Sequence, residues 1–227
     1  MIENINNRCV AVIVAGGQGL RMNNAMPKQF LPIHGQPVLY HTIKAFLNAI
    51  PDIKIVLVLP IGHLSYANMV LQLFPDGIDL TIVTGGNNRF ESVKNGLGAV
   101  NDNDVVFVHD GVRPMISEAL IKRCLEGALL NGSAIPAIPV EKVVRKLHSD
   151  FSEVVDSSLL RIVQSPQTFK GKVLLSAFEQ KFQESFIDEA SVVEHSGVKI
   201  YIVEGETRNL RIINEEDLII AEALMRK

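Results

Sequence analysis

Short apolar runs rich in β-branched residues recur along this chain, and stretches with a helical period separate them. The runs are residues 9–15, 53–59, 79–84 and 104–109, with a further one at 134–139. Runs that are apolar throughout, rather than alternating, are typical of strands covered on both faces. Strands that alternate with helices are typical of parallel sheets. The pattern therefore predicts a doubly wound, mainly parallel α/β sheet.

The helical stretches have recognisable ends. Pro37 suits the first position of a helix that continues through residues 38–48. Ser117 is a suitable N-cap for a helix over residues 118–131, which Gly132 would end. Further elements are expected as helices at 64–74, 89–99 and 170–182, a strand at 199–203, and a last helix from Asn214.

Residues 140–163 interrupt the alternation with a charged, β-branched stretch that has a polar tip near residues 148–150. We expect a hairpin arm that leaves the core and packs on another subunit. No internal repeat or low-complexity linker divides the chain. The expected organisation is one domain over residues 1–227 with the arm at 140–163 inserted in it.

Composition and charge exclude several classes of protein. The net charge of −3 over 227 residues provides no broad basic field for nucleic acid or a membrane surface. The polar N-terminus has no apolar signal-peptide segment, and no apolar stretch reaches the ~18 residues of a membrane span. Cys9 and Cys124 are expected to be buried free thiols in a reducing compartment. We therefore expect a cytoplasmic protein.

Glycine or charged side chains follow several of the predicted strands. The segments are AGGQGLRM…PKQ after the first strand, GGNNRFESV after the third, HDGVRP after the fourth and PVEKVV after the fifth. Ligands of open parallel sheets bind beyond the carboxyl ends of the strands. These segments are therefore expected to converge on one ligand site.

The first of these segments predicts a phosphate-binding loop. Gly16, Gly17 and Gly19 let the backbone approach a ligand closely, and free N–H groups can bind phosphate oxygens. Arg21 and Lys28 can neutralise charge that develops on a reacting phosphate. The two common glycine-rich nucleotide motifs are both absent. We expect this loop to hold a nucleoside triphosphate.

The second segment contains a turn that leads into a helix. Asn87 or Asn88 could cap that helix, and Ser92 could face a ligand. A plain helix start and a binding loop are both compatible with these residues.

The fourth strand ends in a more specific pattern, HDGVRP. Asp110 could bind a divalent cation directly or through water, and Arg113 could bind an anionic second substrate. A structural pair between Asp110 and Arg113 is the alternative. His109 is expected to be packed rather than reactive. Asp188 and Glu189 are expected to be capping or solvated groups.

Other catalytic patterns are missing from the sequence. No Cys/His spacing suits zinc, and no nucleophile elbow is present. The interleaved basic and aromatic residues typical of nucleic-acid binding are also missing.

Six segments together resemble a known family. AGGQGLRM…PKQF, GGNNRFESVKNGL, VHDGVRP, QSPQTF, DEASVVE and VEGETRNLRI occur in the order and spacing of the 2-C-methyl-D-erythritol 4-phosphate cytidylyltransferases. The resemblance implies a Rossmann-like nucleotidyltransferase sheet and a homodimer in which the arm reaches the partner's active site. It implies that CTP and the polyol phosphate react with Mg²⁺ present, releasing pyrophosphate in non-mevalonate isoprenoid synthesis.

The resemblance also implies roles for individual residues. Those implied to hold CTP are Ala15, Gly16, Gly17, Gly19, Gly86, Asn87, Ser92 and Asp110. Those implied to bind the second substrate are Asp110, Arg113, Ser165 and Arg211. The catalytic positions are Arg21, Lys28, Arg211 and Ser157, and the implied metal contact is Asp110. The attacking phosphate is already anionic, so positioning and charge neutralisation can carry the catalysis without a general base.

The sequence departs from the family on the side of the second substrate. Ser157 stands where the family usually has Arg, and Lys142-Val143 stand where it usually has Asp-Thr. Arg211 replaces Lys and Ser165 replaces Thr, which preserves a cation and a hydroxyl. Lys142, Arg145 or Arg161 could supply the missing cation. Two alternatives remain open: a ribitol-5-phosphate cytidylyltransferase, and a CTP-binding protein without turnover.

Overall fold

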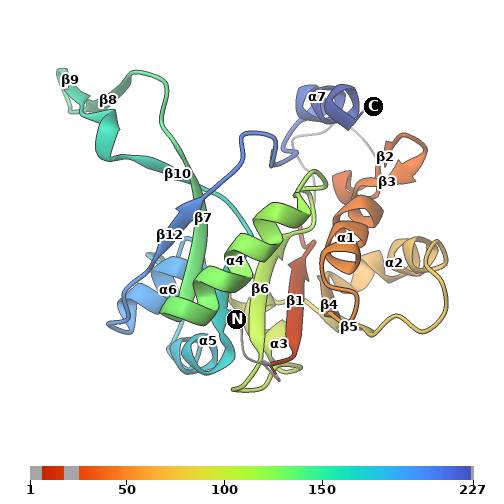
Figure 1. Ribbon diagram of the computed structural model, residues 1–227. Coiled ribbons are helices and arrows are strands. Elements are labelled where there is room, and N and C mark those ends of the chain that lie inside the picture. Colours follow the sequence, from red (N-terminus) through yellow and green to blue (C-terminus); the bar gives the residue numbers. More distant parts are fainter. Residues whose placement is uncertain (1–6, 18–25, 226–227) are drawn as a thin grey trace.

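A central eight-stranded sheet dominates the computed structural model, which describes residues 7–17 and 26–225 (Figure 1). Its strands follow the order β10-β7-β11-β6-β1-β4-β5, and β12 pairs with β7. The strands are β1 (Cys9–Val14), β4 (Lys54–Leu59), β5 (Leu80–Thr84), β6 (Val105–Asp110), β7 (Ser133–Pro139), β10 (Arg161–Val163), β11 (Gln167–Lys170) and β12 (Ile202–Glu204). The four strands β5, β4, β1 and β6 are parallel, which confirms the predicted fold class.

Seven α-helices surround this sheet in the described part of the chain. They are α1 (Val38–Ala49), α2 (Leu64–Leu71), α3 (Arg89–Leu97), α4 (Glu118–Asn131), α5 (Gly171–Ala177), α6 (Glu189–His195) and α7 (Glu215–Met225). Three short 3₁₀ helices are η1 (Lys28–Phe30), η2 (Ile61–His63) and η3 (Ser157–Leu159). Two small antiparallel pairs are β2 (Pro32–Ile33) with β3 (Gln36–Pro37), and the hairpin of β8 (Val144–Leu147) with β9 (Ser152–Val155). No helix of the described residues is long and apolar enough to cross a bilayer.

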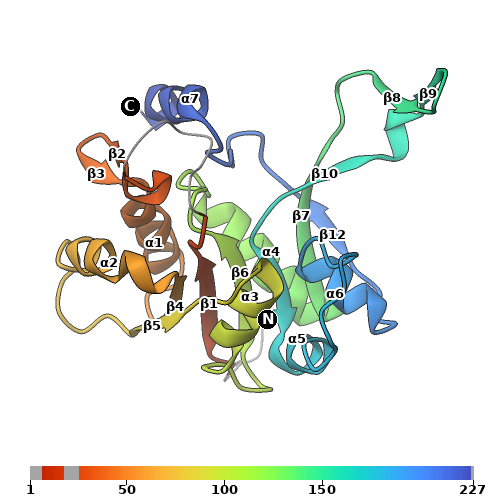
Figure 2. The ribbon, with the colours of Figure 1, turned by 180° about the vertical axis from the view of Figure 1, so that it is seen from behind.

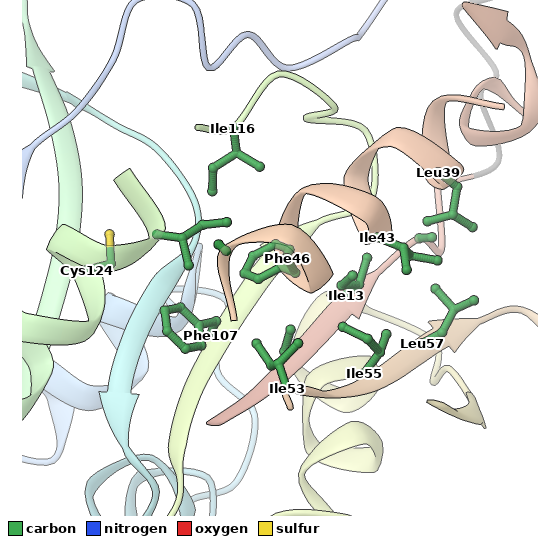
Figure 3. Packing of buried hydrophobic residues seen from close by; sticks show 14 of the residues in the cluster. Ile13, Leu39, Ile43, Phe46, Ile53, Ile55, Leu57, Phe107, Ile116 and Cys124 are labelled. Carbon is green, nitrogen blue, oxygen red and sulfur yellow. The ribbon is translucent and has the colours of Figure 1, made fainter. Parts of the chain in front are cut away.

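Alternate side chains of each parallel strand enter different halves of the core. Ala11 and Ile13 of β1 pack with α1, α2 and α4, whereas Val10 and Val12 pack with α3, α5 and α6. This alternation explains why the strands are apolar at every position. Figure 2 shows the sheet from the side opposite to Figure 1. Figure 3 shows how Phe46 of α1 packs near Phe107 of β6, with ring centroids 5.9 Å apart.

Three predicted helix ends are confirmed in detail. The Ser117 hydroxyl accepts a hydrogen bond from the Leu120 N–H at 3.0 Å, as an N-cap does. Gly132 ends α4 in the left-handed conformation, with φ of 89°. Asn214 likewise caps α7, because its side-chain oxygen accepts from the Asp217 N–H at 2.9 Å.

The C-terminal third departs from the predicted elements. The helix expected at 170–182 ends at Ala177, and the strand expected at 199–203 lies at 202–204, where Ile202 pairs with Ile135 of β7. Strand β11 and helix α6 were not predicted. They have only four and seven residues, too few for a clear hydrophobic period.

The predicted arm is a hairpin that projects from the sheet (Figures 1 and 2). Strands β8 and β9 pair with each other in antiparallel register, from Val144 opposite Val155 to Leu147 opposite Ser152. The last part of the 140–163 stretch returns to the main sheet, because β10 pairs with β7. Large apolar side chains of the arm are exposed, including Leu147 at 80% and Leu159 at 84%.

Candidate active site

Three of the four segments predicted to converge do so at the carboxyl ends of β1 and β6, whereas the PVEKVV segment after β7 does not reach this place. The chain runs from β1 outward through β4 to β5 and then crosses to β6 on the other side of β1. Such a reversal of strand order opens a crevice for ligands. A cavity of about 320 Å³ lies here, lined by the segments that follow β1, β5 and β6 together with Lys28, Gln29 and Arg211.

The loop after β1 forms one wall of this cavity. Ala15, Gly16 and Gly17 line it, and Lys28 enters it from η1. The position of a Cβ on Gly16 has no described protein atom within 4 Å, and on Gly17 it would lie 3.9 Å from Cε of Lys28. The wall therefore has open space beside a cation. Gly19 and Arg21, both predicted site residues, lie outside the described residues.

Gln29 fixes this loop and was not predicted as a site residue. It is 1% exposed and its side-chain N–H donates to the Ala15 carbonyl at 2.8 Å. Its side-chain oxygen has no hydrogen-bond partner among the residues that the structure describes. The sequence signal was its place directly after Lys28 in the PKQF segment.

The segment after β5 forms a second wall. Asn88, rather than Asn87, caps α3, because its side-chain oxygen accepts from the Glu91 N–H at 2.8 Å. The Ser92 hydroxyl accepts from the Gly86 N–H at 3.1 Å and donates to the Asn88 carbonyl at 2.8 Å. Gly86, Asn87 and Ser92 all line the cavity. The segment is thus both a capped helix start and a wall of the candidate site.

Asp110 at the end of β6 lies among three arginines. Its two carboxylate oxygens accept from Arg89 at 2.8 Å and from Arg113 at 3.0 Å, and Arg211 approaches to 3.6 Å. The pair with Arg113 that the sequence offered as an alternative is therefore present. Burial would raise the pKa of Asp110, but the arginines outweigh it and hold the pKa far below its usual range. The carboxylate is ionised at any working pH.

Not all residues predicted to bind the second substrate line the cavity. Arg211 does, whereas Arg113 lies behind Asp110 and also donates to the Asn209 carbonyl at 2.8 Å. Ser165 is 3% exposed, and its hydroxyl accepts from the Asp110 N–H at 3.1 Å. The same hydroxyl lies 3.0 Å from Nδ1 of His109. Ser165 thus holds the cavity wall from behind, and its contact with a substrate stays a prediction.

His109 is packed, as expected. It is fully buried against Phe46, with ring centroids 5.1 Å apart. Burial lowers the pKa of His109 to about 4.

Ser157 lies in the arm and is not among the residues that line the cavity. It begins η3, which Asp156 caps by accepting from the Ser158 N–H at 3.0 Å. Val143 is 81% exposed. Within one chain, therefore, the structure does not bring the arm positions to the cavity.

Arg89 and Glu189 are further site residues that sequence reasoning missed. Arg89 lines the cavity and joins Asp110 to Glu189, which lies 100 residues further along the chain. The expectation that Glu189 is solvated is wrong, because it is 1% exposed and paired with Arg89. Asp188 does cap α6, as expected. The signal for Arg89 was its place in GGNNRF, and the signal for Glu189 was its place in DEASVVE, although neither segment shows that the two side chains meet.

The charge of the described cluster is positive. The four cations Lys28, Arg89, Arg113 and Arg211 face only two carboxylates, Asp110 and Glu189, which leaves a surplus of two positive charges. Such a surplus in a partly enclosed cavity favours anionic ligands. The described residues contain no group of three or more His, Cys, Asp or Glu side chains that could hold a metal ion.

Comparison with known proteins agrees with this arrangement. The family model described as 2-C-methyl-D-erythritol 4-phosphate cytidylyltransferase matches residues 9–227. Proteins of that name from Bacteroides fragilis and Phocaeicola vulgatus are 45% and 42% identical, over 95% and 94% of this chain and 98% of each relative.

Solved structures show the same relationship. The 4-diphosphocytidyl-2C-methyl-D-erythritol synthase from Anaerococcus prevotii has a TM-score of 0.83 and 25% identity, covering 97% of this chain and 99% of that one. The 2-C-methyl-D-erythritol 4-phosphate cytidylyltransferase from Thermus thermophilus has a TM-score of 0.73 and 28% identity, covering 95% and 98%. With a family match from Cys9 to Lys227 and a positively charged cavity at the strand reversal, this chain belongs to the 2-C-methyl-D-erythritol 4-phosphate cytidylyltransferase family.

Proposed function

We propose that this protein joins CTP to 2-C-methyl-D-erythritol 4-phosphate in non-mevalonate isoprenoid synthesis. The products are 4-diphosphocytidyl-2-C-methyl-D-erythritol and pyrophosphate. The observation that carries the proposal is the cavity in which Lys28, Arg89 and Arg211 converge, in a chain that the family model matches from residue 9 to residue 227.

The proposed reaction needs charge neutralisation rather than proton removal. An oxygen of the acceptor phosphate forms a bond to the α-phosphorus of CTP, and the bond from that phosphorus to the bridging oxygen of the β-phosphate breaks. Pyrophosphate leaves with the electron pair. Lys28 and Arg211 lie where they can stabilise the added negative charge, with Arg21 as the further predicted cation. The backbone at Ala15, Gly16 and Gly17 would hold the triphosphate.

The remaining walls suit the nucleoside and the acceptor. Gly86, Asn87 and Ser92 line the side that we assign to cytosine and ribose. Asp110 is an ionised carboxylate that can accept hydrogen bonds from sugar or polyol hydroxyls. Arg113 and Ser165 would act through Asp110, because both contact it from outside the cavity.

Mg²⁺ is part of this proposal as a partner of the triphosphate. Mg²⁺ is commonly held by one or two carboxylates together with substrate phosphates. Asp110 is the one acidic side chain among the described residues that line the cavity, and arginines already contact both of its oxygens. The described donors therefore do not fit a resident metal cage. They fit an ion that arrives with CTP and spreads the charge of its phosphates, with Asp110 as the available protein contact.

A homodimer is the oligomeric state that we propose. The arm exposes Val143, Leu147, Leu159 and neighbouring apolar side chains, and large exposed apolar surface is typical of interaction sites. A second copy could cover this surface and receive Ser157 near its own cavity. We also propose a cytoplasmic location, because Cys9 and Cys124 are both free thiols.

The test is pyrophosphate release from CTP and Mg²⁺ with 2-C-methyl-D-erythritol 4-phosphate or ribitol 5-phosphate in separate reactions. Turnover with the first acceptor is expected. Turnover with ribitol 5-phosphate alone would contradict the proposal and show that the arm substitutions mark a changed acceptor. CTP binding without turnover of either acceptor would show a nucleotide-binding protein.

A further inference from the structure

An ion pair between Arg89, which lines the cavity, and the buried Glu189 joins helices α3 and α6. Arg89 is the first residue of α3, and Glu189 is the first residue of α6. Nε and one terminal nitrogen of Arg89 donate to the two carboxylate oxygens of Glu189 at 2.8 and 3.1 Å. Two parallel hydrogen bonds of this kind fix the plane of a guanidinium group.

The third nitrogen of this guanidinium faces the cavity wall. The other terminal nitrogen of Arg89 donates to a carboxylate oxygen of Asp110 at 2.8 Å. Arg113 contacts the second oxygen of Asp110 at 3.0 Å. The orientation of the Asp110 carboxylate therefore depends on where Glu189 holds Arg89.

The first residue of β11 and the segment just before that strand hold the two ends of this chain of contacts. The Gln167 side chain donates to Asp188 at 2.8 Å and accepts from the Ala190 N–H at 2.7 Å, which fixes the residues on either side of Glu189. Two residues earlier, the Ser165 hydroxyl accepts from the Asp110 N–H at 3.1 Å. Part of the QSPQTF segment thus has a physical role: it sets the spacing between α6 and the end of β6.

Stability alone does not account for this pair. Glu189 is 1% exposed, and moving a carboxylate of this kind from water into the protein interior costs about as much free energy as the ion pair returns. The carboxylates of Glu189 and Asp110 outweigh the effect of burial and raise the pKa of Arg89, so the guanidinium stays charged. Without Glu189, Arg89 would be free to turn toward a triphosphate in the cavity that it lines.

We propose that Glu189 is a positioning residue for the reaction: it holds Arg89 against Asp110, so that Asp110 keeps the orientation needed to receive the hydroxyl groups of the polyol phosphate. The inference rests on the proposed function. Glu189 is not among the residues that line the cavity, so its effect passes through Arg89. Apart from Arg89, the CTP wall is held by hydrogen bonds that do not involve Glu189: Asn88 caps α3, and the Ser92 hydroxyl accepts from the Gly86 N–H.

The test compares Glu189→Gln with the double variant Arg89→Gln/Glu189→Gln. In Glu189→Gln, kcat with 2-C-methyl-D-erythritol 4-phosphate is expected to fall about 10- to 100-fold, the scale of a misplaced contact, with a much smaller change in the dissociation constant of CTP. The single variant should also lower the melting temperature. The double variant carries no buried charge at either position, and its melting temperature should recover while kcat stays low.

A matched control lies at the opposite end of the sheet. Arg8 donates to both oxygens of Asp104 at 3.3 and 2.9 Å, far from the cavity residues along β1 and β6. The double variant Arg8→Gln/Asp104→Asn should leave kcat unchanged. Recovery of kcat together with stability in Arg89→Gln/Glu189→Gln would overturn the proposal, because it would show a purely structural pair. An unchanged kcat in Glu189→Gln, or an equal loss of CTP binding, would overturn it as well.

The parent protein is assayed first in the same experiment. Absence of turnover in the parent would contradict the proposed function, and the inference about Glu189 would fall with it. If the parent turns over and only the Glu189 variants lose turnover, the proposed function stands and the result bears on the pair of Glu189 and Arg89.

Discussion

The cavity and the arm are built on opposite principles. Around the cavity, charged side chains are buried and held by several partners each, as Asp110 is by Arg89 and Arg113. In the arm, apolar side chains such as Leu147 and Leu159 are exposed, and the hairpin pairs only with itself. A site fixed by its own chain can bind a ligand as a monomer, whereas an exposed apolar arm needs another surface. If the proposed homodimer forms, we expect CTP binding to depend on one chain and capture of the acceptor to depend on two.

The largest expected effect lies in the cavity, at Lys28. Lys28→Met should lower kcat about 100- to 1,000-fold, because a cation beside the reacting phosphate acts mainly in the transition state. Steady-state pyrophosphate release measures this change. The matched control is Lys122→Met, where the lysine pairs with Glu118 at 3.6 Å on the exposed face of α4. A loss smaller than about tenfold, or ~1.4 kcal/mol, would remove Lys28 from the proposed catalytic group.

The next effect tests whether the arm needs a partner. Leu159→Asp should weaken self-association by about 3 kcal/mol or more, since a symmetric dimer loses the burial of one leucine on each side. Sedimentation velocity measures the association. Leu130→Asp, at an equally exposed leucine of α4, is the control. The variant should keep CTP binding and lose turnover. A dimer that persists in Leu159→Asp would place the interface elsewhere.

A third prediction concerns His109, the buried residue that precedes Asp110 in β6. His109 has a pKa of about 4 in the folded protein, below the ~6.5 of an unfolded histidine. As the pH falls, this histidine is therefore protonated in the unfolded chain before it is protonated in the folded one. The contribution of neutral His109 to the free energy of unfolding is fully present above about pH 6.5 and is lost as the pH falls toward 4. Between pH 6.5 and 5 the loss is about 2 kcal/mol.

Urea unfolding at pH 7, 6 and 5 measures this loss. Burial also lowers the pKa of His41, so the informative quantity is the difference between the parent and His109→Gln, whose pH dependence should be flatter. His148→Gln, in the hairpin, is the control. Equal slopes for the parent and His109→Gln would show that His109 contributes nothing to the acid sensitivity.

The smallest expected effect tests whether the arm of one copy acts at the cavity of another. If the arm of one copy reaches the cavity of another, Ser157→Arg should lower KM for the acceptor about tenfold, equivalent to one charge-assisted contact of ~1.5 kcal/mol. Ser158→Arg is the neighbouring control.

Arg161, which could compensate in the natural sequence, donates to the Ser158 and Leu160 carbonyls at 2.8 Å each. Arg161→Ala should raise the acceptor KM if it supplies the missing cation, and an unchanged KM would exclude it.

Local patterns were sufficient for the N-terminal half of the fold. The apolar strands β1, β4, β5 and β6 and the caps of α3 and α4 follow from residues that lie next to one another in sequence. The same holds for the cavity walls at residues 15–17 and 86–92 and for the pair of Asp110 with Arg113. Prediction failed where elements were short: α6 has seven residues, and β12 is placed by its pairing with β7.

Sequence alone determined the type of sheet, the strand ends at which a ligand could bind, and the resemblance to the cytidylyltransferase family. These depend on hydrophobic period and on short motifs, which are local properties. Tertiary structure decided which groups hold the site. Glu189 meets Arg89 across 100 residues, and Ser165 faces the Asp110 backbone rather than the cavity. Such contacts arise from the packing of α6 against α5 and the pairing of β11 with β6, and no local pattern in the chain encodes that packing.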